Sequence, residues 1–349
     1  MRFKLLGKSG LRVSQLCLGT MTFGEEWGFG ADKDESRKIF DAFAEAGGNF
    51  IDTANKYTDG TSEKWVGEFM QSDRNKFVLA TKYTLSMDPE DPNSSGNHRK
   101  NLIQSVEASL KRLGTDYIDL LWVHAWDPMT PVEEFMRALD DLVSAGKVFY
   151  VGISDAPAWI VSQANTLAEL RGWSPFVGLQ IKYNLLDRTP ERDLLPMAKA
   201  FDIGVTPWSP LGGGILTGKY NQENSGPKRY APEDPFGKMM LNEKNLSIAG
   251  KVQQIAADVE HTPSQIALRW LIEQSDRGVI IPIIGARTHA QLMDNLRCLE
   301  FEMEANHLDA LERISRIELG FPHDFLEYEA VRSTVYGNTF STIDNHRII

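Results

Sequence analysis

Three ionisable side chains stand at the ends of three successive apolar runs of this sequence. Asp52 ends "NFID", Lys82 ends "KFVLATK" and His124 ends "IDLLWVH". A carboxylate beside a core strand is costly to bury unless a cation meets it. If the three runs are neighbouring strands of one sheet, Asp52 and Lys82 lie side by side, and we expect them to form an ion pair.

A tyrosine, Tyr57, follows Asp52 closely in "IDTANKY". A phenol has a pKa of about 10 and is a weak acid at neutral pH. A neighbouring ammonium favours the phenolate, so we expect Lys82 to lower the pKa of Tyr57 and make it a usable general acid. His124 is expected to donate a hydrogen bond to an oxygen on the reacting carbon. This set suits the reduction of an aldehyde or ketone, with the hydride supplied by a nicotinamide.

Each of these residues also has a purely structural interpretation. The pair of Asp52 and Lys82 would then be a buried ion pair that only sets the register of the strands, although such pairs add little stability. A single histidine at a strand end is commonly a rim residue. The chemical interpretation rests on the occurrence of all three groups on consecutive strands.

The elements that position these groups follow from an alternation along the 349 residues. The apolar runs expected to be strands are 15–19, 49–52, 76–82, 118–124, 148–154, 175–181, 202–208 and 278–285. Between them lie segments with helical spacing, such as Leu102 and Val106 before Gly114. This pattern predicts an α/β fold, a (β/α)8 TIM barrel with an N-terminal β-hairpin over 3–14, as a single domain over 1–349. An open doubly wound sheet is the alternative.

Composition limits the classes of function. A net charge of -11 argues against general nucleic-acid binding. The two cysteines, Cys17 and Cys298, form no disulfide framework, which fits a reducing cytoplasm, and no histidine pair has metal-binding spacing. No apolar run approaches the ~20 residues of a membrane span. We therefore expect a cytoplasmic protein with no nucleic-acid, membrane or metal partner. The oligomeric state is not predicted.

A nicotinamide needs a dinucleotide site, yet no G-x-G-x-x-G occurs. In "WSPLGGGILTGKY" (208–220), Tyr220 stands where a P-loop has Ser or Thr, so we expect backbone amides that approach a diphosphate and no nucleotide hydrolase. A plain glycine turn is the alternative. In "IIGARTHAQLMDNL" (283–296), Arg287 at a helix start can bind a phosphate monoester. Trp208 is either a platform for a nicotinamide ring or part of the core.

These motifs, in this order, resemble those of the aldo-keto reductase family. The resemblance is carried by "GT" (19–20), "IDTANKY" (51–57), "LATK" (79–82), "LLWVH" (120–124), "VGIS" (151–154), "GLQ" (178–180), "WSPLGGGILTGKY" (208–220) and "GARTHAQLMDN" (285–295). The resemblance covers essentially the whole chain. Trp208 stands where many members have a tyrosine, and in this it resembles the aryl-alcohol dehydrogenase-like branch of the family. The resemblance implies reversible, NADPH-dependent reduction of aldehydes or ketones to alcohols, catalysed by Asp52, Tyr57, Lys82 and His124, with Tyr57 as the proton donor.

The resemblance also implies where NADPH binds. The implied cofactor-binding residues are Gly19, Thr20, Met21, Asp52, Ser154, Asp155, Gln180, Trp208, Ser209, Pro210, Leu211, Gly212, Gly214, Leu216, Gly218, Lys219, Gly285, Arg287, Gln291 and Asn295. Asp155 stands where many members have asparagine. Gly-Ala-Arg at 285–287 replaces a lysine-led motif, so the preference for NADPH over NADH depends mainly on Arg287.

The substrate is expected to be a small carbonyl or alcohol compound, with an aromatic or bulky apolar carbonyl favoured. The residues expected to contact it are Trp27, Tyr57, His124 and Trp126. The sequence does not define which carbonyl it is, the preferred direction, or the roles of the loops 83–98 and 220–240 and the tail 321–349. The alternative function is a non-catalytic, cofactor-binding regulatory subunit resembling the potassium-channel β-subunits.

Overall fold

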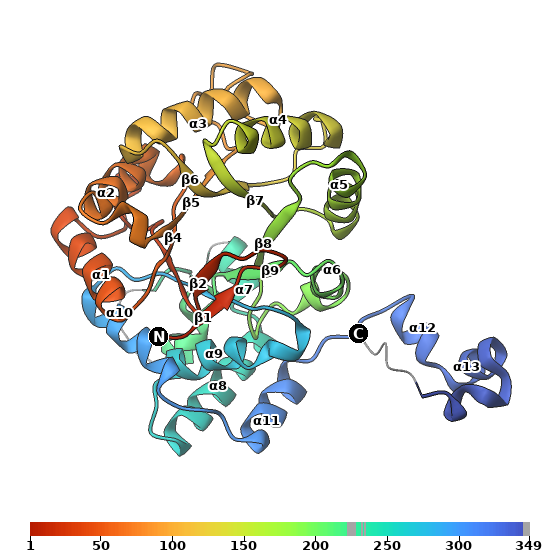
Figure 1. The fold of residues 1–349 in the computed structure, drawn as a ribbon. Coiled ribbons are helices and arrows are strands. Elements are labelled where there is room, and N and C mark those ends of the chain that lie inside the picture. The colour runs from red at the N-terminus through yellow and green to blue at the C-terminus, as the bar shows by residue number, and fades with distance from the viewer. Residues whose placement is uncertain (222–227, 232, 234, 345–349) are drawn as a thin grey trace.

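Eight parallel strands form the centre of the molecule. The computed structural model describes residues 1–221, 228–231, 233 and 235–344. The barrel strands are β3 (Cys17–Gly19), β4 (Phe50–Asp52), β5 (Val78–Tyr83), β6 (Ile118–Val123), β7 (Val148–Ser154), β8 (Phe176–Lys182), β9 (Gly204–Trp208) and β10 (Ile283–Ile284). Their order in the sheet is β10-β3-β4-β5-β6-β7-β8-β9, of which Figure 1 labels β4 to β9. The predicted (β/α)8 barrel is confirmed.

The last strand closes the barrel in two parts. The backbone of Val205 in β9 pairs with Ile280, accepting from Ile281 N at 2.8 Å, whereas β10 itself pairs with β3. Pro282 lies between the two pairings and has no N–H to donate. The predicted run 278–285 is therefore divided, and only Ile283–Ile284 is a strand.

The predicted hairpin is also present and covers one end of the barrel. β1 (Phe3–Leu5) and β2 (Arg12–Ser14) pair antiparallel. Lys8 N donates to Asp202 O at 2.6 Å, just before β9 begins. The hairpin thus closes the end at which the strands start and leaves the opposite rim for the βα loops.

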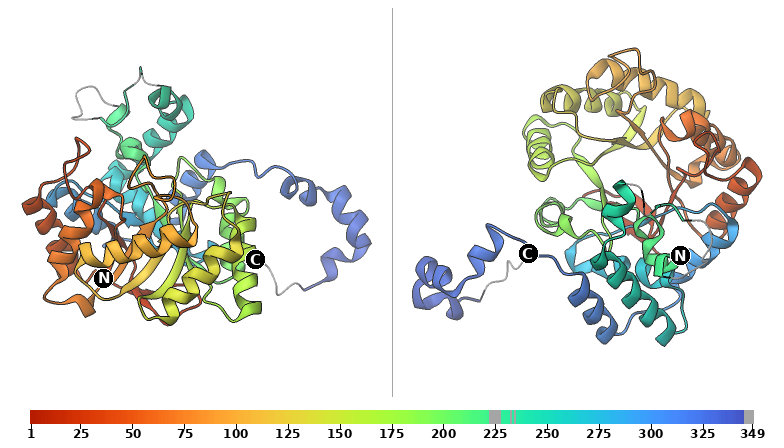
Figure 2. Two further views of the ribbon diagram at one scale, coloured as in Figure 1. Left: turned by 90° about the horizontal axis from the view of Figure 1, so that it is seen from above. Right: turned by 180° about the vertical axis from the view of Figure 1, so that it is seen from behind.

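Helices surround the strands (Figure 2). They are α1 (Lys33–Glu45), α2 (Thr61–Met70), α3 (Arg99–Leu113), α4 (Val132–Ser144), α5 (Ala158–Arg171), α6 (Leu194–Ala200), α7 (Pro235–Met240), α8 (Glu243–Asp258), α9 (Pro263–Ile272), α10 (His289–Leu296) and α11 (Ala305–Ser315). Gly114 ends α3 in a left-handed conformation, as its position in the sequence predicts. No helix in the described part of the chain has the length and apolar character that crossing a bilayer requires.

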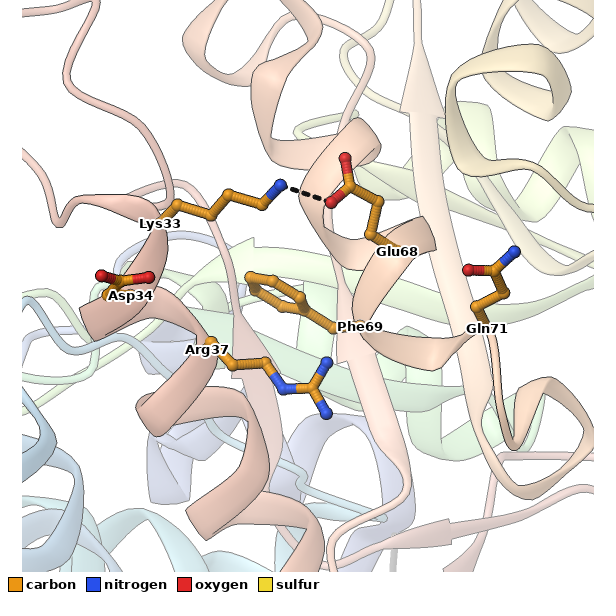
Figure 3. Close-up of a pocket in the computed structure, with 6 residues that line it drawn as sticks. All are labelled: Lys33, Asp34, Arg37, Glu68, Phe69 and Gln71. Carbon is orange, nitrogen blue, oxygen red and sulfur yellow. Dashed lines mark ion pairs between the residues drawn. The ribbon is translucent and has the colours of Figure 1, made fainter.

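The outer wall of the barrel has a shallow depression of about 490 Å³ between α1 and α2 (Figure 3). Three of its charged groups have partners: Lys33 pairs with Glu68, and Arg37 pairs with Asp41 and lies 5.3 Å from the centre of the Phe69 ring. The carboxyl ends of the strands do not converge there, so this depression is not the reactive site.

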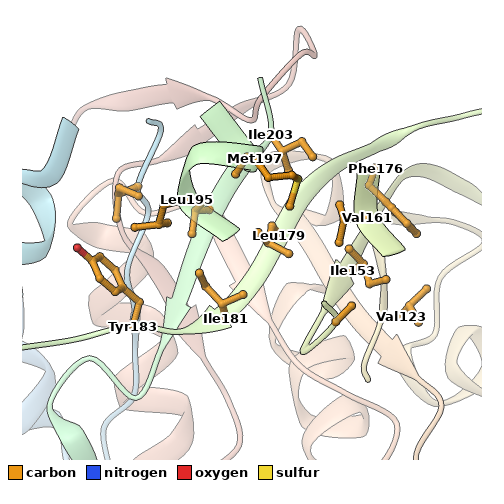
Figure 4. Packing of buried hydrophobic residues seen from close by; sticks show 14 of the residues in the cluster. Val123, Ile153, Val161, Phe176, Leu179, Ile181, Tyr183, Leu195, Met197 and Ile203 are labelled. Carbon is orange, nitrogen blue, oxygen red and sulfur yellow. The ribbon is translucent and has the colours of Figure 1, made fainter. Parts of the chain in front are cut away.

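Apolar side chains pack on both faces of the sheet. Between strands and helices, residues such as Ile153, Leu179 and Val161 form one continuous buried layer (Figure 4). Inside the barrel, the Trp122 indole lies against two glycines of the next strands, Gly152 and Gly178. A filled interior confines functional groups to the rim at the carboxyl ends of the strands.

The chain leaves the barrel after α11. α12 (His323–Glu327), α13 (Glu329–Tyr336) and a 3-10 turn (Gly337–Thr342) pack on one another and stand away from the barrel (Figures 1 and 2). None of their residues is buried. We call residues 319–344 the C-terminal arm.

Candidate active site

The Lys82 ammonium is the centre of a buried polar cluster. Its Nζ forms a short ion pair with Asp52 Oδ2 and donates to Thr53 O at 2.8 Å and to Tyr57 Oη at 3.1 Å. The other Asp52 oxygen, Oδ1, accepts from Gln180 Nε2 at 2.9 Å. The ammonium thus has three acceptors, and both carboxylate oxygens have donors, so neither charge is left unpaired in the barrel.

Strand register brings these residues together. Asp52 is opposite Ala80 in β5, so Lys82, two residues further, points to the same interior side. Tyr57 begins a 3-10 turn in which Thr58 and Asp59 have left-handed φ values of 46° and 52°. Thr58 Oγ1 donates to Phe23 O at 2.7 Å and anchors that turn. Strained backbone of this kind is typical of functional loops.

The protonation states follow from burial and charge. Burial by itself would lower the pKa of Lys82, but the charges of Asp52 and Tyr57 outweigh it and raise that pKa. Burial raises the pKa of Tyr57 above its ordinary value, and the opposing effect of Lys82 is smaller. Lys82 does act to lower this pKa, as predicted, but burial outweighs it, so the expectation that the pKa of Tyr57 lies below its usual value is wrong. Tyr57 keeps its proton at neutral pH and has it available to donate.

His124 follows β6 and faces Tyr57. The two ring centres are 5.9 Å apart, at an interplanar angle of 83°. Its Nδ1 is buried with no hydrogen-bond partner among the described residues, so Nε2 is the nitrogen that faces the open rim. Burial, with a further contribution from Lys82, lowers the pKa of His124 to about 3. A neutral imidazole that carries its proton on Nε2 is a hydrogen-bond donor to a ligand.

Aromatic rings flank this cluster on two sides. The Trp27 ring lies 6.4 Å from that of Tyr57 and 6.2 Å from that of Phe29. Beyond His124, the rings of Trp126 and Trp159 meet edge to face at 5.9 Å. Trp27 and Trp126 were predicted to contact substrate and lie at the rim. Phe29, in a loop, and Trp159, in the first turn of α5, were not predicted, because a single exposed aromatic residue has no periodic signal.

The residues expected around a nicotinamide lie at the ends of β7, β8 and β9. Ser154 and Gln180 are paired in the strand register. Asp155, at φ 47°, accepts from Trp208 Nε1 at 3.0 Å through its Oδ1. Gln180 donates from its amide nitrogen to Asp52 and so connects the ends of β7 to β9 with the ion pair of Asp52 and Lys82.

A glycine-rich loop follows β9. Gly212, Gly213 and Gly214 have φ values of 56°, 64° and 91°, which favour glycine over any other residue. Asn184 Nδ2 donates to Ser209 O at 2.9 Å and fixes the start of the loop. A Cβ at Gly213 would lie 2.1 Å from Tyr230 Oη. The sequence did not single out Asn184 or Tyr230, since neither belongs to a local motif.

The predicted loop 209–219 ends at Lys219, near two other cationic side chains. Burial lowers the pKa of Lys219, with Arg287 and Lys228 adding to the effect, so these three cations are close enough to interact. Gln291 Oε1 accepts from Arg287 N at 2.9 Å, and Asn295 Nδ2 donates to Gly285 O at 3.4 Å. Both amides therefore hold the loop at 285–287. The expectation of a loop over 220–240 is wrong at its end, where Pro235–Met240 form α7, and residues 222–227, 232 and 234 lie outside the described residues.

The remaining predicted cofactor residues follow β3. Thr20 Oγ1 donates to Asp52 O at 3.0 Å, so this hydroxyl supports the backbone that carries the carboxylate. A Cβ at Gly19 would lie 2.6 Å from Ile283 Cγ2, which explains the need for glycine there. Met21 is partly exposed in the turn that follows.

The polar loop 83–98 is tied to the neighbouring loop. Asn97 donates from its backbone to Asp127 Oδ2 at 3.0 Å and from Nδ2 to Thr84 Oγ1 at 2.9 Å. Asp127 N in turn donates to Asn97 Oδ1 at 2.8 Å. This segment is therefore built into the rim, next to His124, and the pairing of Asn97 with Asp127 could be recognised only in three dimensions.

The rim fits a nicotinamide dinucleotide by its own chemistry. It offers the flat Trp208 ring at one end, three successive glycines that allow close approach to the backbone, and a cluster of three cations at the other end. Backbone amides and clustered cations bind phosphate groups. The buried cluster around Lys82 lies beside the aromatic end.

Known proteins with similar sequences have related chemistry. The chain is 39% identical to a norsolorinic acid reductase of Aspergillus flavus over 332 residues, covering 92% of this chain and 83% of the relative. It is 38% identical to a putative aryl-alcohol dehydrogenase of Saccharomyces cerevisiae (93% and 89% coverage) and 37% identical to an aryl-alcohol dehydrogenase of Pestalotiopsis microspora (94% and 85%). A sequence profile of the Aldo/keto reductase family matches residues 15–316. The barrel, the rim chemistry and these similarities together show that the chain belongs to the aldo/keto reductase family.

Proposed function

We propose that this protein is an NADPH-dependent carbonyl reductase that converts aldehydes or ketones to alcohols reversibly, with Tyr57 as the general acid. The observation that supports this most directly is the hydrogen bond of 3.1 Å from Lys82 Nζ to Tyr57 Oη, with Asp52 paired to the same ammonium. A proton donor backed by a fixed cation is what protonation of a carbonyl oxygen requires.

In the proposed reaction, Tyr57 Oη gives its proton to the substrate oxygen as that oxygen gains negative charge. Lys82 already donates to Tyr57 Oη, so it stabilises the phenolate that forms. His124 Nε2 donates to the same substrate oxygen and orients the carbonyl. Bound NADPH would supply the hydride to the carbonyl carbon.

The residues proposed to hold NADPH are those of the rim. Trp208 would stack on the nicotinamide, Ser154, Asp155 and Gln180 would bind its carboxamide, and the loop 209–219 would surround the diphosphate. Arg287, with Gln291 and Asn295 shaping its loop, would bind the 2′-phosphate, which is why we expect NADPH to be preferred to NADH.

The substrate class is proposed from the walls of the site and from the relatives. The ring of Trp27, which contacts Phe29, also lies against Tyr57. Trp126, which contacts Trp159, follows His124 by two residues. The similar proteins are named for norsolorinic acid and for aryl alcohols. We therefore expect aromatic carbonyl compounds to be the best substrates. The two buried free cysteines agree with a cytoplasmic location.

Replacement of Tyr57 by phenylalanine tests the role of the acid. We expect Tyr57→Phe to lower kcat for 4-nitrobenzaldehyde by about 10² to 10⁴-fold, because the proton donor is lost, while the Kd for NADPH changes little. Tyr117→Phe, which removes a surface hydroxyl bound to Asn75, is the matched control. A Tyr57→Phe enzyme with the wild-type rate would contradict the proposal.

Replacement of Arg287 tests the cofactor preference. Arg287→Ala is expected to weaken NADPH binding by roughly tenfold or more, since it removes a charge-assisted phosphate contact, and to leave NADH binding nearly unchanged. Calorimetric titration of both cofactors measures this. Equal losses for NADH and NADPH would remove Arg287 from its proposed role.

A further inference from the structure

Asp155 is held in place on three sides. Its backbone N donates to Gln180 O at 3.2 Å, and its backbone O accepts from Trp126 N at 3.4 Å. Its side-chain Oδ1 accepts from Trp208 Nε1 at 3.0 Å. An indole N–H only donates, so it needs an acceptor such as a carboxylate. The left-handed backbone of Asp155, at φ 47°, is a strained conformation that these contacts maintain.

The bond to Trp208 also fixes the plane of that ring. Trp208 is only partly buried, so its position is not determined by packing on every side. Asp155 Oδ1 is occupied by this bond, whereas Oδ2 has no hydrogen bond or ion pair among the described residues and belongs to an exposed residue. One carboxylate therefore positions the stacking ring and also presents a free oxygen beside it.

The cations near this carboxylate have other partners, although the charge of Lys82 still partly opposes burial, which raises the pKa of Asp155. The nearby ammonium of Lys82 is paired with Asp52, and Lys182 in β8 is paired with Asp187 at 3.1 Å. His124 and Tyr57 are neutral at neutral pH. Within residues 1–221, 228–231, 233 and 235–344, Asp155 forms no ion pair, so the end of the site that faces Trp208 has a net negative charge.

Resting on the proposed function, we propose that Asp155, positioned by Trp208, makes the site selective for the oxidation state of the nicotinamide. The oxidised ring has a positive charge and the reduced ring has none. A carboxylate beside the ring would attract the first and not the second. The site therefore binds NADP⁺ more tightly, relative to NADPH, than a site with a neutral residue at this position would.

Tighter binding of the oxidised form has a consequence for the chemistry. Because binding and redox equilibria are linked, a site that favours NADP⁺ makes bound NADPH a stronger hydride donor. Transfer of a hydride from bound NADPH to a carbonyl carbon would then be favoured. Asp155 would act on the cofactor only and has no part in proton transfer, so its effect is separable from that of Tyr57.

The test is a pair of binding constants measured by calorimetry at neutral pH. In Asp155→Asn, the amide oxygen still accepts from Trp208 and only the charge is lost. We expect the Kd for NADP⁺ to rise by on the order of tenfold, while the Kd for NADPH changes less than about twofold. In Trp208→Phe the ring is no longer positioned but the charge remains, so both affinities should fall by similar factors. Asp41→Asn, at the surface of α1, is the matched control for loss of one carboxylate.

The outcomes separate this inference from the proposed function. If the wild-type protein binds both cofactors and Asp155→Asn leaves the ratio of the two Kd values unchanged, the inference is wrong although the proposed function stands. If Asp155 has only a structural role, Asp155→Asn should raise the Kd values for both cofactors by similar factors, and their ratio would again stay unchanged. If the wild-type protein binds neither cofactor, the proposed function itself fails.

Discussion

At the scale of single residues, the position of Lys82 decides the chemistry of its neighbours. Its Nζ joins Asp52 and Tyr57, and its charge also helps to lower the pKa of His124. The sequence predicts that these residues lie together. It does not predict the direction in which the pKa of Tyr57 moves, because that depends on how much of the phenol is buried once the loops have packed.

His124 gives a prediction about pH and stability. Its pKa is about 3 in the folded protein against an ordinary value of 6.5, so the unfolded chain binds the extra proton between these values. Stability is then lost as the pH falls from 6.5 toward 3, with a slope of at most about 1.4 kcal/mol per pH unit. His124→Asn should reduce that slope, measured by urea unfolding at several pH values. His289→Asn, at an exposed position, is the control, and identical slopes in His124→Asn and wild type would contradict the prediction.

At the scale of secondary-structure elements, one side chain sets the spacing of three strands. Trp122 in β6 lies against Gly152 in β7 and Gly178 in β8, where added Cβ atoms would lie 2.4 and 2.6 Å from its ring. The glycines therefore serve the packing of the barrel interior, below the reactive rim. In the sequence, Gly152 and Gly178 are single glycines within apolar runs. No pattern indicates that Trp122 packs against them.

This packing predicts a pair of compensating substitutions. Gly178→Ala should destabilise the protein by about 1–3 kcal/mol, since the added methyl overpacks the interior. Combining it with Trp122→Leu should recover part of that loss, because the smaller side chain leaves room. Chemical denaturation of the single and double variants measures the coupling. Gly10→Ala, with no atom within 4 Å of the added Cβ, is the control. Additive effects of the two substitutions would show that this contact is not limiting.

At the scale of the whole molecule, the barrel and the C-terminal arm differ in how they are held. α11 is joined to the loop after β8 through Arg188, which is buried and donates to Glu312 Oε1 at 2.7 Å and to Ser315 Oγ at 2.9 Å. Beyond it, Glu318 O accepts from Arg192 at 3.0 Å, and the residues of the arm's helices remain unburied. Large apolar side chains in the arm, such as Phe321, are exposed.

Removal of the arm should therefore cost little stability. A protein that ends at Glu318 is expected to unfold thermally within about 2 °C of the full chain, because residues 319–344 bury almost no surface. Ending it at Glu304 instead removes the buried Leu311 and the hydrogen bonds from Arg188 to Glu312 and Ser315, and should lower the midpoint of thermal unfolding clearly. A large loss of stability in the protein that ends at Glu318 would show that the arm packs on the barrel in solution.

The sequence by itself determined the alternation of strands and helices, and with it the barrel and the rim at which Asp52, Lys82 and His124 gather. These features depend on local periodicity and on the rule that parallel strands end at one edge. The hydrogen bond between Asp155 and Trp208, the support of Ser209 by Asn184 and the raised pKa of Tyr57 were decided only by the tertiary structure. They depend on contacts between residues far apart in the chain and on burial, and neither has a signature in any short stretch of sequence.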